Sequence, residues 1–146
     1  MNFTHLHVHT EYSLLDGSNK IQEYVNRVKE LGMDSAAITD HGVMYGVIDF
    51  YRAARAAGIN PVLGCEVYVA PGSRFDREIG SGDDRYYHLV LLAENNQGYA
   101  NLMKIVSKSF VEGFYYKPRV DLQLLEKYHE GLIALSACLA GEVARY

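Results

Sequence analysis

Short apolar segments alternate along this chain with longer segments whose apolar residues recur at the helical period. The short segments lie at residues 3–8, 35–39, 61–70, 86–93 and 132–135, and they predict buried strands. The longer segments lie at residues 18–31, 42–57, 99–111, 121–128 and 139–146, and they predict helices. Repeated strand and helix units predict an α/β fold with a parallel sheet, either open or closed into a barrel.

Particular residue types mark the helix ends and the remaining segments. Ser18 and Asp121 are residues that commonly cap a helix N-terminus, and Gly32 stands where the first helix should end. Residues 71–85 are polar and contain several glycines, which predicts a long exposed loop of a kind that is often functional. Residues 112–120 are expected to form a connector.

Composition bounds the class of protein. The chain has 146 residues, of which 49% are hydrophobic, with 13 Gly and 3 Pro. These values suit one globular domain that buries roughly two-thirds of its unfolded surface, and they exclude disordered and fibrous proteins. No stretch approaches the roughly 18 apolar residues of a membrane span and no secretory signal opens the chain, so we expect a cytoplasmic protein. Cys65 and Cys138 are then expected to be free thiols.

The formal net charge of −4 argues against a surface that coats nucleic acid, because such a surface would be basic. It does not exclude a nuclease. Carboxylates that bind divalent ions count as negative in a sequence, but the bound ions attract phosphate.

Histidines alternate with apolar residues in the first predicted strand. Side chains alternate across a strand, so His5, His7 and His9 would project from one face, with Leu6 and Val8 on the other. Imidazole is the commonest protein ligand for zinc and related ions. The spacing therefore predicts a metal site, although any one of these histidines alone could equally be a core or hydrogen-bonded residue.

Further possible ligands lie near the ends of the predicted strands. They are Asp16, Asp40, His41, Glu66 and Cys138. Parallel βα folds carry their chemistry at the C-terminal rim of the strands, so we expect these side chains to converge there. His88 lies earlier in its strand and would have to point inward to join them.

Three early segments, residues 5–17, 37–42 and 64–70, resemble the opening motifs of the polymerase and histidinol phosphatase (PHP) domain. Later segments resemble one branch of that family, which forms the N-terminal part of the bacterial replicative DNA polymerase III alpha subunit. These segments lie at residues 73–77, 87–93, 98–102, 112–119 and 135–142. The resemblance covers essentially the whole chain.

The resemblance implies a distorted seven-stranded TIM-like parallel βα barrel, of which this chain would hold about five βα units. It also implies up to three divalent metal ions at the rim, zinc or manganese, with magnesium serving the full polymerase. The metal ligands would be His7, His9, Asp16, His41, Glu66, His88 and Cys138. The catalytic set would be His7, His9, Asp16, Asp40 and His41, with Asp40 orienting His41 or a neighbouring backbone group.

Strand alternation adds detail to this set. If Glu66 points to the rim, Cys65 points into the packing layer as an inert residue. His5 lies one pleat deeper than the ligand histidines, which predicts a buried residue behind them. His129 lies on a polar helix and is expected to be solvated. Cys138 could serve packing alone, yet a thiolate is a good zinc ligand.

Metal-assisted phosphoester hydrolysis is the implied chemistry, because bound ions lower the pKa of water from about 15.7 toward 7. In the full polymerase the substrate would be the 3′ end of DNA, and the reaction would be 3′–5′ exonuclease proofreading. Candidate phosphate contacts are Arg74, Arg77, Arg85, Lys117 and Arg119. Tyr115 and Tyr116 could stack on bases, with ordinary surface charge and aromatic packing as the alternative.

The family's late Asp-x-His motif does not occur between Met1 and Tyr146. We therefore expect residues 1–146 to be the N-terminal part of a PHP domain, a single incomplete domain of a longer polymerase that has other replicase subunits as partners. Its metal cluster should be incomplete. An unpaired edge strand would favour a homodimer.

Two other functions stay open at this point. One is a catalytically silent module that supports the polymerase or docks its subunits, which would bind no metal. The other is a phosphomonoesterase of the histidinol phosphate type, whose small substrate would give residues 73–77 and 112–119 no role.

Overall fold

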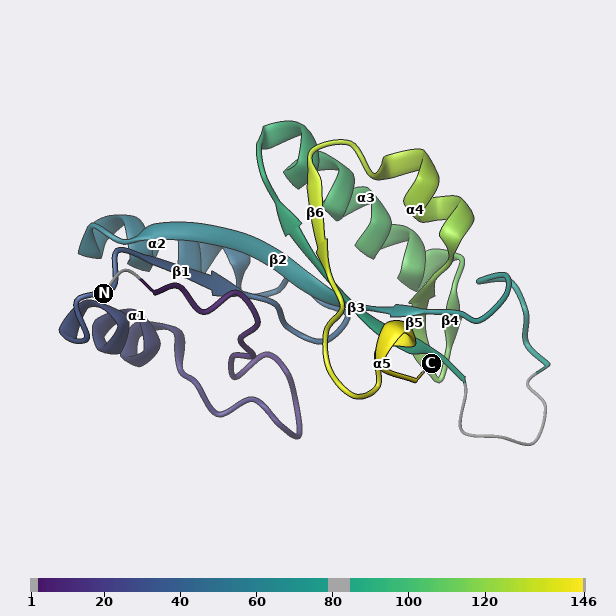
Figure 1. The fold of residues 1–146 in the computed structure, drawn as a ribbon, viewed down its shortest axis with the longest axis horizontal. Coiled ribbons are helices and arrows are strands. Elements are labelled where there is room, and N and C mark those ends of the chain that lie inside the picture. Colours follow the sequence, from purple (N-terminus) through teal and green to yellow (C-terminus); the bar gives the residue numbers. More distant parts are fainter. Residues whose placement is uncertain (1–2, 79–84, 146) are drawn as a thin grey trace.

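The computed structural model describes residues 3–78 and 85–145. Its elements, in chain order, are α1 (Ile21–Glu30), β1 (Ser35–Ile38), α2 (Val47–Ala57), β2 (Asn60–Val69), β3 (Tyr87–Ala93), α3 (Asn96–Val111), β4 (Phe114–Tyr115), β5 (Lys117–Val120), α4 (Leu122–Tyr128), β6 (Leu132–Leu135) and α5 (Glu142–Arg145). Figure 1 shows the long strand β2 running from a lobe that contains α1, α2 and β1 to a lobe that contains α3 and α4. The predicted α/β class is confirmed. No described helix is long and apolar enough to cross a membrane.

The sheet is mixed, because β2 pairs in parallel with β1 and β5 but antiparallel with β3. The strand β6 also pairs antiparallel, with β3. The expectation of an all-parallel sheet is therefore wrong for β3 and β6. A parallel neighbour needs a crossover that is usually a helix. The described residues between β2 and β3 contain no helix, so the chain returns in the opposite direction.

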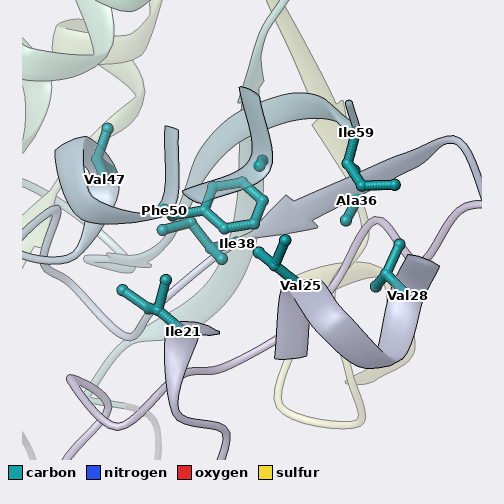
Figure 2. Close-up of a cluster of buried hydrophobic side chains, with 9 residues drawn as sticks. Ile21, Val25, Val28, Ala36, Ile38, Val47, Phe50 and Ile59 are labelled. Carbon is teal, nitrogen blue, oxygen red and sulfur yellow. The ribbon is translucent and has the colours of Figure 1, made fainter. Parts of the chain in front are cut away.

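Two apolar cores lie on the helical sides of the sheet. The first packs α1 and α2 against β1, and Figure 2 shows Val25 and Phe50 at its middle. The second packs β2 and β3 against α3 and α4 and includes Leu102 and Cys65. Cys65 is fully buried, as strand alternation predicted. Burying a large apolar side chain of these cores, such as Phe50 or Leu102, stabilises the fold by about 1.5–3 kcal/mol.

The predicted strand at residues 3–8 does not form. The segment does run beside β1, because Ala37 donates a backbone hydrogen bond to the His5 carbonyl and Thr39 donates one to the Val8 carbonyl. The two acceptors are three positions apart in the sequence while the two donors are two positions apart, so the pairing slips by one residue and no regular ladder forms.

This slip alters the alternation on which the histidine prediction depended. His5 is exposed, with its ring against that of Phe3 at 4.8 Å between centroids. The prediction of a buried His5 behind the ligands is therefore wrong. His129 is exposed, as expected.

The helix ends follow the sequence signals only in part. The helix α1 begins after Lys20 with no side-chain cap, so the expected cap at Ser18 is wrong. Gly32 has a left-handed φ of 70° just beyond the end of α1, as predicted. Asp121 caps α4 by accepting a hydrogen bond of 2.9 Å from the Leu124 amide, which confirms that prediction.

The expected connector at residues 112–120 contains the strands β4 and β5, which pair antiparallel as a hairpin. Both strands are short, and Pro118 interrupts the second, so the sequence carries little strand signal there. Within the loop predicted at residues 71–85, residues 71–78 lie outside helices and strands, and residues 79–84 lie outside the described part of the chain.

Candidate metal centre

Glu66 of β2 is the hub of a cluster of imidazoles. Its side chain is fully buried, and its Oε2 atom lies 2.6 Å from His9 Nε2 and 2.9 Å from His7 Nε2. The same oxygen is 3.3 Å from His41 Nδ1, while Oε1 is 2.9 Å from His88 Nδ1. His88 therefore points inward. Four imidazoles from three separate segments thus meet around one carboxylate.

A second carboxylate lies on the solvent side of this cluster. Asp16 Oδ2 is 2.9 Å from His41 Nε2 and 3.3 Å from His9 Nδ1, and its side chain is 50% exposed. Three triplets of ligand atoms have all members within 4.8 Å of one another, and they are His7, His9 and Glu66; His9, Asp16 and His41; and His41, Glu66 and His88. Because the triplets share members, the cluster could hold more than one ion.

His41 supplies a further sign that the donor set suits a metal. Its Nδ1 atom is buried and makes no hydrogen bond, although Glu66 lies 3.3 Å away. Buried polar atoms are rarely left without a partner, and each one calls for an explanation such as an ion. Imidazole and carboxylate donors together are the usual ligands of zinc and manganese, so the residues present fit such an ion.

The ionisation of the cluster also favours metal binding. Burial raises the pKa of Glu66, but hydrogen bonds with His88, His9 and His7 outweigh burial and hold this pKa well below its usual range. Burial lowers the pKa of His41. At neutral pH, Glu66 is therefore ionised and His41 is neutral, and these are the forms that bind metal.

His9 differs, because its hydrogen bond with Glu66 raises the pKa of the imidazole despite partial burial. A proton on His9 would compete with an ion for the same nitrogen.

Asp40 is 2% exposed and lies apart from the histidine cluster. Its Oδ1 atom accepts hydrogen bonds from the Thr10 amide at 2.6 Å and the Ser13 hydroxyl at 2.7 Å, and its Oδ2 atom accepts one from the Thr10 hydroxyl at 2.7 Å. Ser13 Oγ in turn accepts a hydrogen bond from the His41 amide. Asp40 thus fixes the turn that presents Asp16, in keeping with the expectation that it orients a neighbouring backbone group and does not bind metal itself.

Cys138 lies at the edge of the site. Its Sγ atom is 3.5 Å from His88 Nδ1 and 3.8 Å from Glu66 Oε1, and the residue is exposed. The segment is held beside β3 because the His88 amide donates to the Ala140 carbonyl. The thiol is therefore within reach of the cluster without belonging to any of its three triplets.

The structure corrects two of the expected phosphate contacts. Arg74 is buried and forms ion pairs with Asp121 at 2.9 Å and Glu112 at 2.8 Å. Arg119 is 1% exposed and donates hydrogen bonds to backbone carbonyls, including that of Gly113. Both guanidinium groups hold the protein together and are unavailable to DNA. Arg77 is exposed.

One residue of the site was missed from the sequence. The Tyr68 ring stacks on the His41 ring, with 6.0 Å between centroids and 12° between planes. Tyr68 stands two residues after Glu66 in the same strand, so alternation would have placed both on one face.

The chain matches the PHP domain family over residues 5–146. It belongs to the PHP domain family. Among curated relatives, it is 54% identical over 143 residues to the DNA polymerase III subunit alpha of Treponema pallidum (strain Nichols), a match that covers 98% of this chain and 12% of that protein. It is 49% identical over 150 residues to the corresponding subunit of Aquifex aeolicus (strain VF5), covering 99% of this chain and 13% of that protein. The PHP chain thus spans about an eighth of the length of these relatives.

A solved structure from Bifidobacterium adolescentis, assigned as a metal-dependent phosphoesterase, has a similar fold. The TM-score is 0.52 and the identity is 19%, with 74% of this PHP chain and 33% of that chain covered. At this identity the similarity concerns the fold alone.

Proposed function

We propose that this PHP chain is a metal-dependent phosphoesterase centre of a bacterial DNA polymerase III alpha subunit, and that it removes nucleotides from the 3′ end of DNA. The observation that carries the proposal is the convergence of four imidazoles on the buried carboxylate of Glu66, with His41 Nδ1 left without a hydrogen bond. Relatives named as polymerase subunits support the polymerase context, which would place the protein in the cytoplasm with DNA and other replicase subunits as partners.

The ions would be held by His7, His9, Asp16, His41, Glu66 and His88, with Cys138 as a further donor. Divalent ions bound there, zinc or manganese, would activate water and neutralise negative charge on the phosphate. Glu66 fixes the orientation of the imidazoles through its hydrogen bonds, and Asp40 holds the turn that carries Asp16.

Substrate has an open route to this cluster. A cleft of about 470 Å³ is lined by His7, His9, Asp16 and Tyr24, among other residues. Ligand sites in proteins usually have volumes of roughly 300–1,000 Å³, so a nucleotide could enter. The half-exposed Asp16 and the partly exposed His7 face this cleft and would meet the phosphate first. Arg77 and Lys117 remain candidate contacts for the rest of the DNA.

The test compares two substrates on the full-length polymerase subunit that contains this chain, with manganese or zinc added. We expect nucleotide release from a DNA 3′ end, and a loss greater than about 10–100-fold in Glu66→Gln, because even residues outside the ligand shell cause losses of that size. Glu94→Gln is the matched control, because Glu94 is an exposed carboxylate that directly follows β3 and lies outside the cluster. Phosphate release from a monoester without any nucleotide release would instead favour a phosphatase, and no bound ion would favour a docking module.

A further inference from the structure

One exposed tyrosine is held in a backbone conformation that disfavours it. Tyr116 lies at the turn between β4 and β5, where it has a left-handed φ of 60°. Bulky residues rarely adopt this region, whereas Gly adopts it without strain. The Tyr116 side chain is 64% exposed, so core packing does not explain why a tyrosine stands there. Strain of this kind concentrates at functional sites.

Cationic side chains accompany this ring. The guanidinium carbon of Arg85 lies 4.7 Å from the centroid of the Tyr116 ring. Tyr115 packs edge-on against Tyr116 at 4.7 Å between centroids. The next residue, Lys117, places its Nζ atom 5.4 Å from the centroid of the Tyr68 ring. The exposed Tyr116 ring thus has one cation, Arg85, against its face, and a second cation, Lys117, belongs to the next residue and lies against Tyr68.

Contacts between rings connect these side chains to the metal centre, because Lys117 lies against Tyr68. The Tyr68 ring stacks on His41, and it meets Tyr86 edge-on at 4.9 Å between centroids. Tyr86 stacks in turn on His88 at 6.0 Å and 12°. Figure 1 shows the β4–β5 hairpin beside the start of β3, where Tyr86 and Arg85 precede the strand.

Aromatic rings that alternate with cations are the usual means of holding single-stranded nucleic acid, since bases stack on the rings and phosphates pair with the cations. In a duplex the base faces are already stacked on one another. We infer that Tyr116, with Arg85 and Lys117, forms a stacking subsite for an unpaired nucleotide of single-stranded DNA beside the metal centre. This inference rests on the proposed function for its choice of DNA, but binding at the subsite requires no hydrolysis.

The test is a fluorescence anisotropy titration of a short oligothymidylate with the chain in chelator at fixed low salt. Stacking is worth roughly 1–3 kcal/mol per base, so Tyr116→Gly should weaken binding about 5- to 150-fold. Its urea midpoint should stay unchanged or rise, because glycine relieves the left-handed strain. Tyr116→Phe should bind within about threefold of wild type, since it keeps the ring. Tyr51→Ala, on an exposed tyrosine of α2, is the control and should change neither quantity appreciably.

Wild-type binding by Tyr116→Gly, or no binding of the oligonucleotide by the wild type, would overturn the inference. Lost binding together with a lowered urea midpoint would assign Tyr116 to folding, and equal binding of a blunt duplex would overturn the preference for an unpaired nucleotide. Hydrolysis is measured separately with manganese on the full-length subunit that contains this chain. Binding through Tyr116 with no nucleotide release by the full-length subunit would contradict the proposed function and leave the subsite standing.

Discussion

The substitution Asp40→Asn tests how far the hydrogen bonds of Asp40 support the turn that carries Asp16. In the native protein, Asp40 is 2% exposed and its carboxylate accepts three hydrogen bonds, all between 2.6 and 2.7 Å, from Thr10 and Ser13. Asparagine keeps one oxygen, which can still accept from the Thr10 amide and the Ser13 hydroxyl, both bound to Oδ1 in the native protein. Its amide nitrogen would face the Thr10 hydroxyl and would force that hydroxyl to reorient.

The expected cost follows from these contacts. A hydrogen bond to a charged group is worth about 1.5–3 kcal/mol and a neutral one about 0.5–1.5 kcal/mol. Losing one charged bond costs about 1.5–3 kcal/mol, and neutralising two others costs about 1–1.5 kcal/mol each, so the free energy of unfolding should fall by about 3.5–6 kcal/mol. With a urea m-value of roughly 2 kcal/mol/M, the midpoint should fall by about 2–3 M at unchanged m.

Metal affinity should fall with it, because the turn that carries Asp16 loses its anchor. Partners behind a metal ligand typically contribute 10–100-fold in affinity, and a zinc titration measures this. Asp49→Asn, on an exposed carboxylate of α2, is the matched control and should cost less than about 1 kcal/mol, with unchanged zinc affinity. Wild-type stability in Asp40→Asn would refute the hydrogen-bond argument, and intact stability with abolished zinc binding would make Asp40 a direct ligand.

Three further substitutions test other parts of the structure. Phe50→Ala, in the fully buried centre of the first core, should cost about 3–5 kcal/mol in urea unfolding, against less than about 1 kcal/mol for Tyr51→Ala on the exposed side of the same helix. Burial raises the pKa of Tyr24 from 10.0 to about 12, so the contribution of Tyr24 to the free energy of unfolding should be constant below pH 10 and should fall between pH 10 and 12, where the unfolded state ionises first. Tyr24→Phe should reduce the fall in stability between pH 10 and 12, and an identical pH profile in that variant would contradict the shift. Gly17→Ala should weaken zinc binding and lower the urea midpoint, because the added Cβ would lie 1.8 Å from the Thr10 carbonyl oxygen; an unaffected variant would show that the turn is not rigid.

Much of the fold could be predicted because hydrophobic period and helix signals are local. The strand β1 and the helix α4 match their predicted segments closely, and Asp121 caps α4 as its residue type indicated. The helix α2 ends where predicted but begins at Val47, several residues later than expected. Strand direction is not local. Periodicity gives a strand but not the sense in which it pairs, so β3 was expected to be parallel and is antiparallel.

The candidate site shows the same division. Residue types and positions near strand ends predicted that the histidines and acids would meet, and the structure brings them together. Their individual roles depended on contacts across the fold. Asp40 accepts hydrogen bonds from Thr10, a partner that its residue type alone did not name, and Arg74 pairs with Asp121, forty-seven positions away in the sequence. His5 lies outside the cluster because its segment slips by one residue against β1, which breaks the alternation of side chains.

Anomalous scattering from crystals grown with zinc or manganese is the most direct test of the metal centre. We expect at least one peak about 2 Å from donor atoms of Glu66 and of His7, His9, His41 or His88, and its loss in crystals of Glu66→Gln. A map without a peak among these side chains, at an occupancy detectable elsewhere in the same crystal, would contradict the proposal that this PHP chain binds catalytic metal.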